Sequence, residues 1–171
     1  MAASEGNIVL VGMPGVGKST AGVLLAKALS RAFVDTDLLI QSRECRRLQD
    51  IIDEIGVERF RALEERYVLT FEYRETVVAT GGSVIYSEPA IAHLRRGGVV
   101  VYLELPYADL VRRIRNLDDR GVVRAPGQSF EALYEERRPL YEAAADVTVA
   151  CAGLDHEGVV AAALQAIGRV A

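Results

Sequence analysis

A glycine-rich stretch near the start of the chain has the residue types and spacing of a phosphate-binding loop. The segment from Gly12 to Thr20 reads G-M-P-G-V-G-K-S-T and fits the pattern G-x-x-x-x-G-K-S/T. In such a loop the glycines let successive backbone N–H groups point at an anion, the lysine reaches the β- and γ-phosphates, and the following hydroxyl ligates Mg²⁺. The sequence therefore predicts a nucleoside triphosphate site formed by Gly12, Gly15, Val16, Gly17, Lys18, Ser19 and Thr20.

Two acids and two glycines stand at the ends of other strand-like runs. Asp35 and Asp37 flank one residue, and in a phosphoryl-transfer site one such acid can lie near Mg²⁺ while the other receives the acceptor's hydroxyl hydrogen. Asp37 equally suits a plain N-cap of the next helix. Gly81 and Gly82 let backbone N–H groups approach a carboxylate or phosphate, although paired glycines also form simple turns.

Arginines supply the cations that such a reaction needs. Arg61 lies in a highly charged helical pattern, where by itself it suits a solvated face. A charged segment at about 115–128 contains Gly and Pro and has no periodicity. Arg113 precedes this segment, and Arg120 lies within it. A loop of that length is usually functional, and in a kinase it would be a lid that brings cations to the transferring phosphoryl group. Arg137 could close over the acceptor from the far side.

Alternating strand-like and helix-like stretches must position these groups. Strand-like runs are expected at 7–13, 32–35, 76–79, 99–103 and about 146–150. Helical patterns are expected at 18–30, 37–44, 48–55, 57–72, 88–96, 107–115, 129–144 and 155–169. The alternation predicts an α/β fold in which helices flank a parallel sheet of about five strands and ligands gather at the strands' carboxyl ends. Because no linker interrupts the 171 residues, we expect one domain, 1–171.

The composition limits the classes of partner. A net charge of −4 argues against nonspecific binding to nucleic acid or to a membrane surface, and no apolar run could span a bilayer. Cys45 and Cys151 lack metal-ligand spacing and indicate reduced thiols. His93 and His156 have no ligand-like neighbours in the sequence. We expect a cytoplasmic monomer that has neither nucleic-acid nor membrane partners.

Taken in order, these segments resemble the shikimate kinase family from Asn7 to about Val149. The motifs that carry the resemblance are the phosphate loop, Phe33-Val-Asp-Thr-Asp37, Phe60-Arg61 with Glu64-Glu65, Ala79-Thr-Gly-Gly82, Val100-Val-Tyr-Leu103 and Arg137-Arg-Pro-Leu-Tyr141. The resemblance implies a three-layer P-loop kinase fold with a helical substrate-binding region at about 36–62 and a lid at about 115–128. It also implies ATP- and Mg²⁺-dependent phosphorylation of the 3-hydroxyl of shikimate, in chorismate and aromatic amino-acid biosynthesis.

The same resemblance implies roles for individual residues. Asp37 matches the acid that holds the acceptor hydroxyl, and Asp35 matches the acid on the Mg²⁺ side, where Ser19 is the second ligand. The acceptor carboxylate would be bound by Arg61, Arg137 and the Gly82 amide, beside Gly81. A bidentate guanidinium suits a planar carboxylate. Arg120 matches the arginine that contacts the transferring phosphate, and Arg113 the one that packs on adenine.

Three parts of the sequence depart from the family pattern. The lid reads Arg120-Gly-Val-Val123 where Arg-Pro-Leu-Leu is usual, Ser83 replaces the third glycine of a triplet, and the loop at 152–155 lacks an expected proline. An acceptor other than shikimate, such as homoserine or gluconate, therefore remains an alternative for the same fold. A module that binds nucleotide without transferring phosphate is a second, more distant one.

Overall fold

Five parallel strands form the centre of the structure, a computed structural model that describes residues 6–114 and 122–170. Within that part of the chain the strands are β1 (Asn7–Val11), β2 (Ala32–Asp35), β3 (Thr76–Ala79), β4 (Gly98–Glu104) and β5 (Val147–Ala150). They are ordered β2-β3-β1-β4-β5 across the sheet. In the centre, Val9 is aligned with Val78 on one side and with Val100 on the other. The five-stranded parallel sheet expected from the sequence is confirmed.

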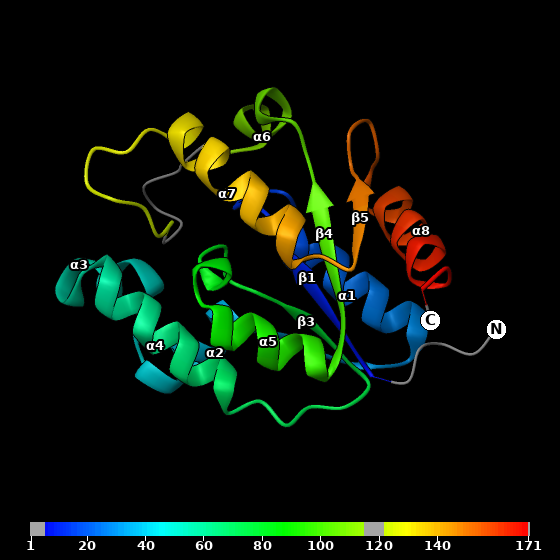
Figure 1. Cartoon of the computed structure of the whole chain (residues 1–171), viewed down its shortest axis with the longest axis horizontal. Coiled ribbons are helices and arrows are strands. Elements are labelled where there is room, and N and C mark those ends of the chain that lie inside the picture. The colour runs from blue at the N-terminus through cyan, green and yellow to red at the C-terminus, as the bar shows by residue number, and fades with distance from the viewer. Residues whose placement is uncertain (1–5, 115–121, 171) are drawn as a thin grey trace.

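Helices cover both faces of this sheet. They are α1 (Lys18–Leu29), α2 (Thr36–Glu44), α3 (Leu48–Ile55), α4 (Val57–Leu69), α5 (Glu88–Arg96), α6 (Tyr107–Arg113), α7 (Phe130–Ala144) and α8 (His156–Ile167), with a short 3₁₀ turn η1 (Val84–Tyr86). In Figure 1, α5 and α7 lie on the near side of the sheet, and α1 and α8 pack together behind it. Helices α2, α3 and α4 form a group beside the sheet (Figure 1). This is the three-layer α/β/α arrangement that the resemblance implied.

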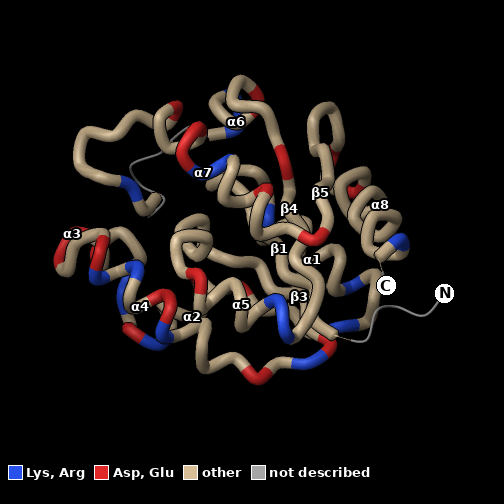
Figure 2. Tube along the Cα trace, in the orientation of Figure 1, with Lys and Arg blue, Asp and Glu red and all other residues tan. Residues whose placement is uncertain are grey.

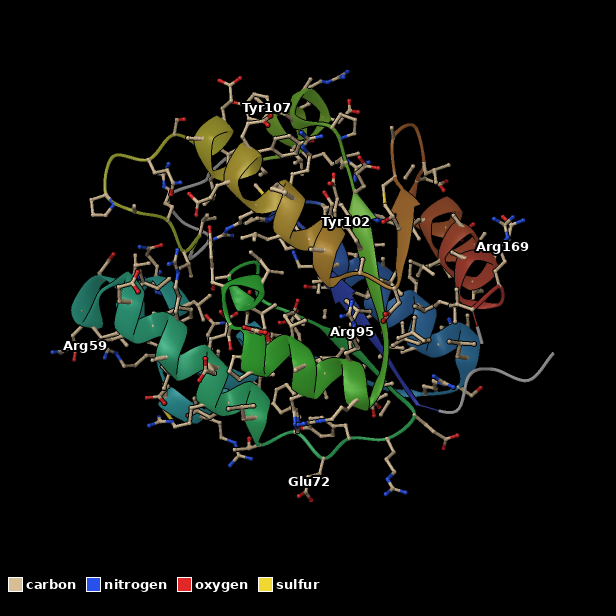
Figure 3. All side chains as sticks on the ribbon, viewed as in Figure 1. Arg59, Glu72, Arg95, Tyr102, Tyr107 and Arg169 are labelled. Carbon is tan, nitrogen blue, oxygen red and sulfur yellow. The ribbon has the colours of Figure 1, made fainter. Side chains whose placement is uncertain are left out.

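The central strands are apolar on both sides because both faces of a parallel sheet are covered. Val9, Val77, Val100 and Val101 are fully buried. Tyr102 on β4 stacks on Tyr141 of α7 with ring centroids 5.3 Å apart, which ties the helix to the sheet; Figure 3 labels Tyr102 beside that helix. The long apolar strands therefore form the core on which the site is built.

Several element ends differ from the expectations. Strand β1 ends at Val11 and not at residue 13, because Gly12 takes a φ of 146° and turns the chain into the phosphate loop. Helix α4 ends at Leu69 and not at residue 72, since the backbone N–H and the hydroxyl of Thr70 both donate to the Tyr67 carbonyl and close the last turn. The turn η1 was not expected from the sequence.

A second, smaller apolar cluster lies among α2, α3 and α4, apart from the core of the sheet. It contains Ile40, Leu48, Ile51, Ile52, Phe60 and, from the chain before α7, Val123. Along these helices arginines are interspersed among Asp and Glu (Figure 2). Among the described residues, no helix is both long enough and apolar enough to cross a membrane.

Candidate active site

The loop between β1 and α1 forms a cradle that only glycine permits at two positions. Gly12 and Gly15 have φ values of 146° and 85°, in the region that favours glycine. A Cβ at Gly12 would lie 2.7 Å from the Leu103 carbonyl oxygen of β4, and a Cβ at Gly15 would strike the Ile114 side chain. Helix α1 begins immediately afterwards at Lys18, so its N-terminus adds partial positive charge to the same place. The loop therefore fits the triphosphate of a nucleotide.

Lys18 is buried inside this loop. Its Nζ donates to the carbonyl oxygens of Gly12, at 2.8 Å, and Met13, at 3.0 Å. Burial lowers the pKa of Lys18 to about 8, and the nearby carboxylate of Asp37 partly opposes that shift. A desolvated ammonium held only by neutral carbonyls interacts strongly with an incoming phosphate, because little water must be displaced.

Ser19 and Asp35 form the part of the site that suits Mg²⁺. The Ser19 hydroxyl donates to Asp35 Oδ2 at 2.5 Å, so the two oxygen ligands already lie together. Hydroxyl and carboxylate oxygens are the ligands that Mg²⁺ accepts alongside phosphate. Asp35 Oδ1 accepts from the backbone N–H groups of Asp37 and Leu38 and caps α2. Asp35 is therefore the N-cap, and the alternative that Asp37 has this role is wrong.

Asp37 instead lines a cavity of about 880 Å³ beside the phosphate loop. Sequence-predicted residues that share this cavity are Gly15, Gly17, Lys18, Ser19, Thr20, Gly81, Gly82, Arg113 and Arg137. Gly12, Val16 and Asp35 lie outside its lining. Arg61 lines a neighbouring cavity of about 1190 Å³ between α4 and the chain before α7. Arg120 and the first half of the expected lid, residues 115–121, lie outside the described residues.

The Gly81-Gly82 turn is held rigidly at the floor of the cavity. The Gly81 N–H donates to the Thr36 hydroxyl at 2.8 Å, and the Gly82 carbonyl accepts from the Tyr141 hydroxyl at 2.6 Å. A Cβ at Gly81 would overlap Glu64 Oε1 and Asp37 Oδ1. A larger residue here would therefore push apart the two carboxylates of the site.

Glu64 is a buried acid next to this cavity, and its sequence motif with Phe60 and Arg61 assigned it no role in the site. Its Oε2 accepts from the Ser83 hydroxyl, and its Oε1 has no partner among the described residues. Burial, followed by the charge of Asp37, raises the pKa of Glu64 to about 7. Burial, followed by the charge of Asp35, raises the pKa of Asp37 to about 6. A detectable signal existed, because Glu64 lies at helical spacing between the buried Phe60 and Val68.

Two guanidinium groups converge on one aromatic ring near the cavity. The Arg61 and Arg137 guanidinium carbons lie 3.9 and 5.3 Å from the centroid of Tyr86. Arg137 is fully buried, and it donates from Nε to the Tyr86 hydroxyl and from Nη2 to the Val123 carbonyl. Arg137 Nη1 and Arg61 Nε are buried without a hydrogen-bond partner among the described residues. Both N–H groups are therefore available to an anionic ligand.

The opposite end of the cavity has the groups that suit a nucleoside. Arg113 donates to the carbonyl oxygens of Val16 and Leu154, so it bridges the phosphate loop and the loop before α8. His156 also lines the cavity, with Cε1 3.7 Å from a Cβ built on Gly17, although no sequence motif points to this position. Its place beside the loop depends on a contact between chain segments far apart in sequence.

The geometry is matched by known proteins. The family model described as "Shikimate kinase" matches residues 14–168. The chain belongs to the shikimate kinase family. A shikimate kinase of Sulfurihydrogenibium sp. (strain YO3AOP1) is 35% identical over 139 residues, which cover 81% of this chain and 84% of that protein. The shikimate kinase of Persephonella marina is 34% identical over 148 residues, covering 86% and 90%.

Solved structures agree with this membership. The shikimate kinase from Acinetobacter baumannii in complex with shikimate superposes with a TM-score of 0.84 at 28% identity, covering 98% of this chain and 96% of that one. The shikimate kinase from Aquifex aeolicus gives 0.80 at 30% identity, covering 95% and 96%. A gluconokinase from Sinorhizobium meliloti shares the fold, with a TM-score of 0.58 at 22% identity over 97% and 93% of the chains. Membership in this family makes the chain a phosphotransferase with an alcohol acceptor that uses ATP and Mg²⁺.

Proposed function

We propose that this chain transfers the γ-phosphate of ATP to the 3-hydroxyl of shikimate. The observation that carries the proposal is the cavity in which Lys18, Asp37 and Arg137 meet, in a chain of the shikimate kinase family. One cavity thus offers a cation for phosphate, an acid for a hydroxyl and a buried guanidinium for a carboxylate. A small hydroxy acid is the class of acceptor that uses all three.

The proposed mechanism is in-line transfer in which positioning and charge neutralisation do most of the catalysis. Asp37 accepts a hydrogen bond from the acceptor hydroxyl and takes its proton as the new phosphorus–oxygen bond forms and ADP leaves. Lys18 neutralises charge on the transferring group. We assign Arg120, outside the described residues, to the same charge. Ser19 and Asp35 would hold Mg²⁺, which would supply positive charge next to the phosphate groups.

The acceptor carboxylate is assigned to Arg61, Arg137 and the Gly82 amide. Arg137 Nη1 is buried and unpartnered among the described residues, and a Cβ on Gly82 would lie 2.8 Å from it, so the two groups are neighbours. Ser83, which departs from the family pattern, donates its hydroxyl to Glu64. This donation keeps the Ser83 side chain within the protein's own network and leaves the pocket compatible with the shikimate ring.

The test is a coupled ADP-release assay over shikimate, homoserine and gluconate at equal concentrations. We expect turnover with shikimate to exceed that with the other acids by about 100-fold or more, since a site that hydrogen-bonds specific groups rejects analogues lacking them. Turnover with homoserine or gluconate and none with shikimate would replace the proposed acceptor. ATP binding without turnover of any of the three would contradict the proposal of a small hydroxy acid acceptor.

We further infer a monomeric, cytoplasmic enzyme without nucleic-acid or membrane partners. The support is the net charge of −4 and the two cysteines, Cys45 and Cys151, both of which are free thiols. Light scattering at micromolar concentration tests the monomer.

A further inference from the structure

Tyr86 is an unassigned aromatic residue between the two arginines of the acceptor site. It ends η1, the turn that follows Gly82 and Ser83. The Arg61 guanidinium lies 3.9 Å and that of Arg137 5.3 Å from its ring centroid. Attraction between a guanidinium and an aromatic face is strongest when the groups are desolvated, and here each arginine has a buried N–H.

Arg61 depends on this ring more than Arg137 does. Its one ion pair among the described residues joins Nη1 to Glu58 Oε1 at 3.2 Å, and the Glu58 side chain is 85% exposed. Exposed pairs of this kind hold a long side chain only weakly. Without the ring, Arg61 would therefore sample several rotamers, and the acceptor would have to order it on binding.

The hydroxyl of Tyr86 extends the contact to the chain that precedes α7. It accepts from Arg137 Nε at 3.3 Å and donates to Glu136 Oε1, and the second Glu136 oxygen accepts from Gln128 Nε2 at 2.6 Å. The hydrogen bond from Tyr86 holds the pKa of Glu136 below its usual value, so this acid stays ionised as an acceptor.

Gln128 organises the segment next to it. Its Oε1 accepts from the Ala125 N–H at 3.2 Å, and its carbonyl accepts from Arg124 Nη1 at 3.2 Å. Arg137 Nη2 separately donates to the Val123 carbonyl. The segment 123–128 is therefore connected to the acceptor arginines twice, once directly and once through Tyr86, Glu136 and Gln128.

We propose that Tyr86 is a positioning residue for the acceptor's carboxylate, which holds Arg61 and Arg137 in place with its ring and links them through Glu136 to segment 123–128. This inference rests on the proposed function, because it assumes that the two arginines bind a carboxylate. Tyr86 acts through the arginines and not on the reacting atoms. Its removal should therefore change acceptor affinity and leave the chemical step intact.

The first experiment compares Y86L and Y86F with the unsubstituted enzyme on shikimate and on shikimate methyl ester, whose ester group carries no charge. We expect Y86L to raise KM for shikimate about 10-fold, while kcat and KM for ATP stay within about two-fold. With the ester, Y86L should change KM by less than about two-fold, because no carboxylate remains for the arginines to bind. Y86F retains the ring and should raise KM for shikimate only about three-fold.

The second experiment tests the link to segment 123–128 by combining Y86F with Q128A. Each single variant should raise KM for shikimate about three-fold, and the double variant should show about the same three-fold increase, because both break one chain of hydrogen bonds. If the two effects were independent, KM in the double variant would rise about nine-fold, and that result would overturn the link. For the Tyr-to-Leu change in Y86L, the matched control is Y73L. The Tyr73 ring packs on Phe71, and the Tyr73 backbone carbonyl accepts from Asn7.

Several outcomes would overturn the role of Tyr86. An unchanged KM in Y86L, or an equal rise with shikimate and its ester, would each exclude positioning for the carboxylate. Thermal unfolding of each variant separates misfolding from weaker binding, and Y86F keeps the test valid if Y86L unfolds. If the unsubstituted enzyme phosphorylates a different hydroxy acid, the proposed function fails. The same variants are then compared on that acid and its methyl ester, which tests Tyr86 independently.

Discussion

The acceptor end of the site contains two acids, the buried Glu64 and the half-buried Asp37, and two buried cations. Asp37 and Glu64 face Lys18 and Arg137, and the four charges offset one another. Burying such groups costs stability, and a buried network of this kind is weak evidence for structural stabilisation. Strongly perturbed acids that line a cavity are typical of functional sites. We therefore interpret this cluster as a catalytic arrangement that the fold maintains at a cost.

Replacing Asp37 separates chemistry from nucleotide binding. We expect D37N to lower kcat by about 100-fold or more, since the amide cannot take the acceptor proton. The affinity for ATP should stay within about three-fold, because Asp37 does not belong to the phosphate cradle. Initial rates and calorimetric titration with ATP measure the two effects. A loss of ATP affinity as large as the loss of kcat would contradict the assignment of Asp37 to the acceptor.

Glu64 should make the stability of the ligand-free protein depend on pH. Folding raises its pKa from 4.5 to about 7, so the folded state holds the proton more tightly and stability is lost as the pH rises through that range. E64Q removes this loss. We expect E64Q to gain on the order of 2 kcal/mol relative to the parent between pH 5 and pH 8. Urea unfolding at several pH values measures the gain. If the free energies of unfolding of the parent and E64Q changed in parallel with pH, the pKa of Glu64 would be the same in both states, which would contradict the prediction.

At the scale of elements, the two ends of the sheet have different tasks. The carboxyl ends of β1, β2 and β3 lead into the phosphate loop, the Asp35–Asp37 segment and the Gly81-Gly82 turn. The amino ends are braced by Asn7, whose side chain donates to the Tyr73 carbonyl at 2.7 Å and accepts from the Thr76 N–H at 3.0 Å. The residues that stabilise the sheet and the residues of the site thus lie at opposite ends of its strands.

Removing the Asn7 brace should cost stability and spare activity. We expect N7A to lower the free energy of unfolding by about 1–3 kcal/mol, because the buried Thr76 loses the acceptor of its backbone N–H. Aspartate retains that acceptor but cannot donate to the Tyr73 carbonyl, so N7D should lie between the two. Urea unfolding gives the stabilities, and kcat at saturating substrate should be unchanged. If N7A were stable but inactive, the amino ends of the strands would also contribute to the geometry of the site.

In the whole molecule, one large apolar core includes the sheet and the helices on both of its faces, and a smaller apolar cluster lies among α2, α3 and α4. Val123 comes from the chain before α7 and joins that smaller cluster. It also lines the cavity, together with Leu48 and Val122. The packing of α2, α3 and α4 is thus completed by a residue of segment 115–128, which we expect to be a lid, so these helices and that segment are coupled by ordinary apolar contact.

Truncating Val123 should loosen the small cluster selectively. We expect V123A to lower the free energy of local unfolding by about 1–2 kcal/mol. Amide exchange should speed about 10-fold in residues 48–60, while exchange in β1 and β4 should not change. Val149→Ala, the same change in the core of the sheet, is the matched control and should speed exchange in the strands. Hydrogen exchange read by mass spectrometry measures both. Equal effects in the two regions would mean that the clusters unfold as one unit.

Features that depend on neighbouring residues could be predicted from the sequence. The phosphate loop, the strands at 32–35 and 76–79 and most helix boundaries follow from glycine spacing, apolar runs and 3.6-residue periodicity, and the structure agrees with them. The family, too, was readable from motifs in order along the chain. These signals are local, because backbone geometry and the periodicity of apolar residues are properties of residues within one element.

Which side chains come together depends on the three-dimensional structure. It made Asp35 the cap of α2 and left Asp37 to the cavity, buried Glu64 against Ser83, and placed Tyr86 between two arginines. It also brought the histidine at position 156 to the phosphate loop. Apart from the Asp35 cap, these contacts join residues many positions apart, and their consequences, above all desolvation and shifted pKa values, arise only when distant segments exclude water together.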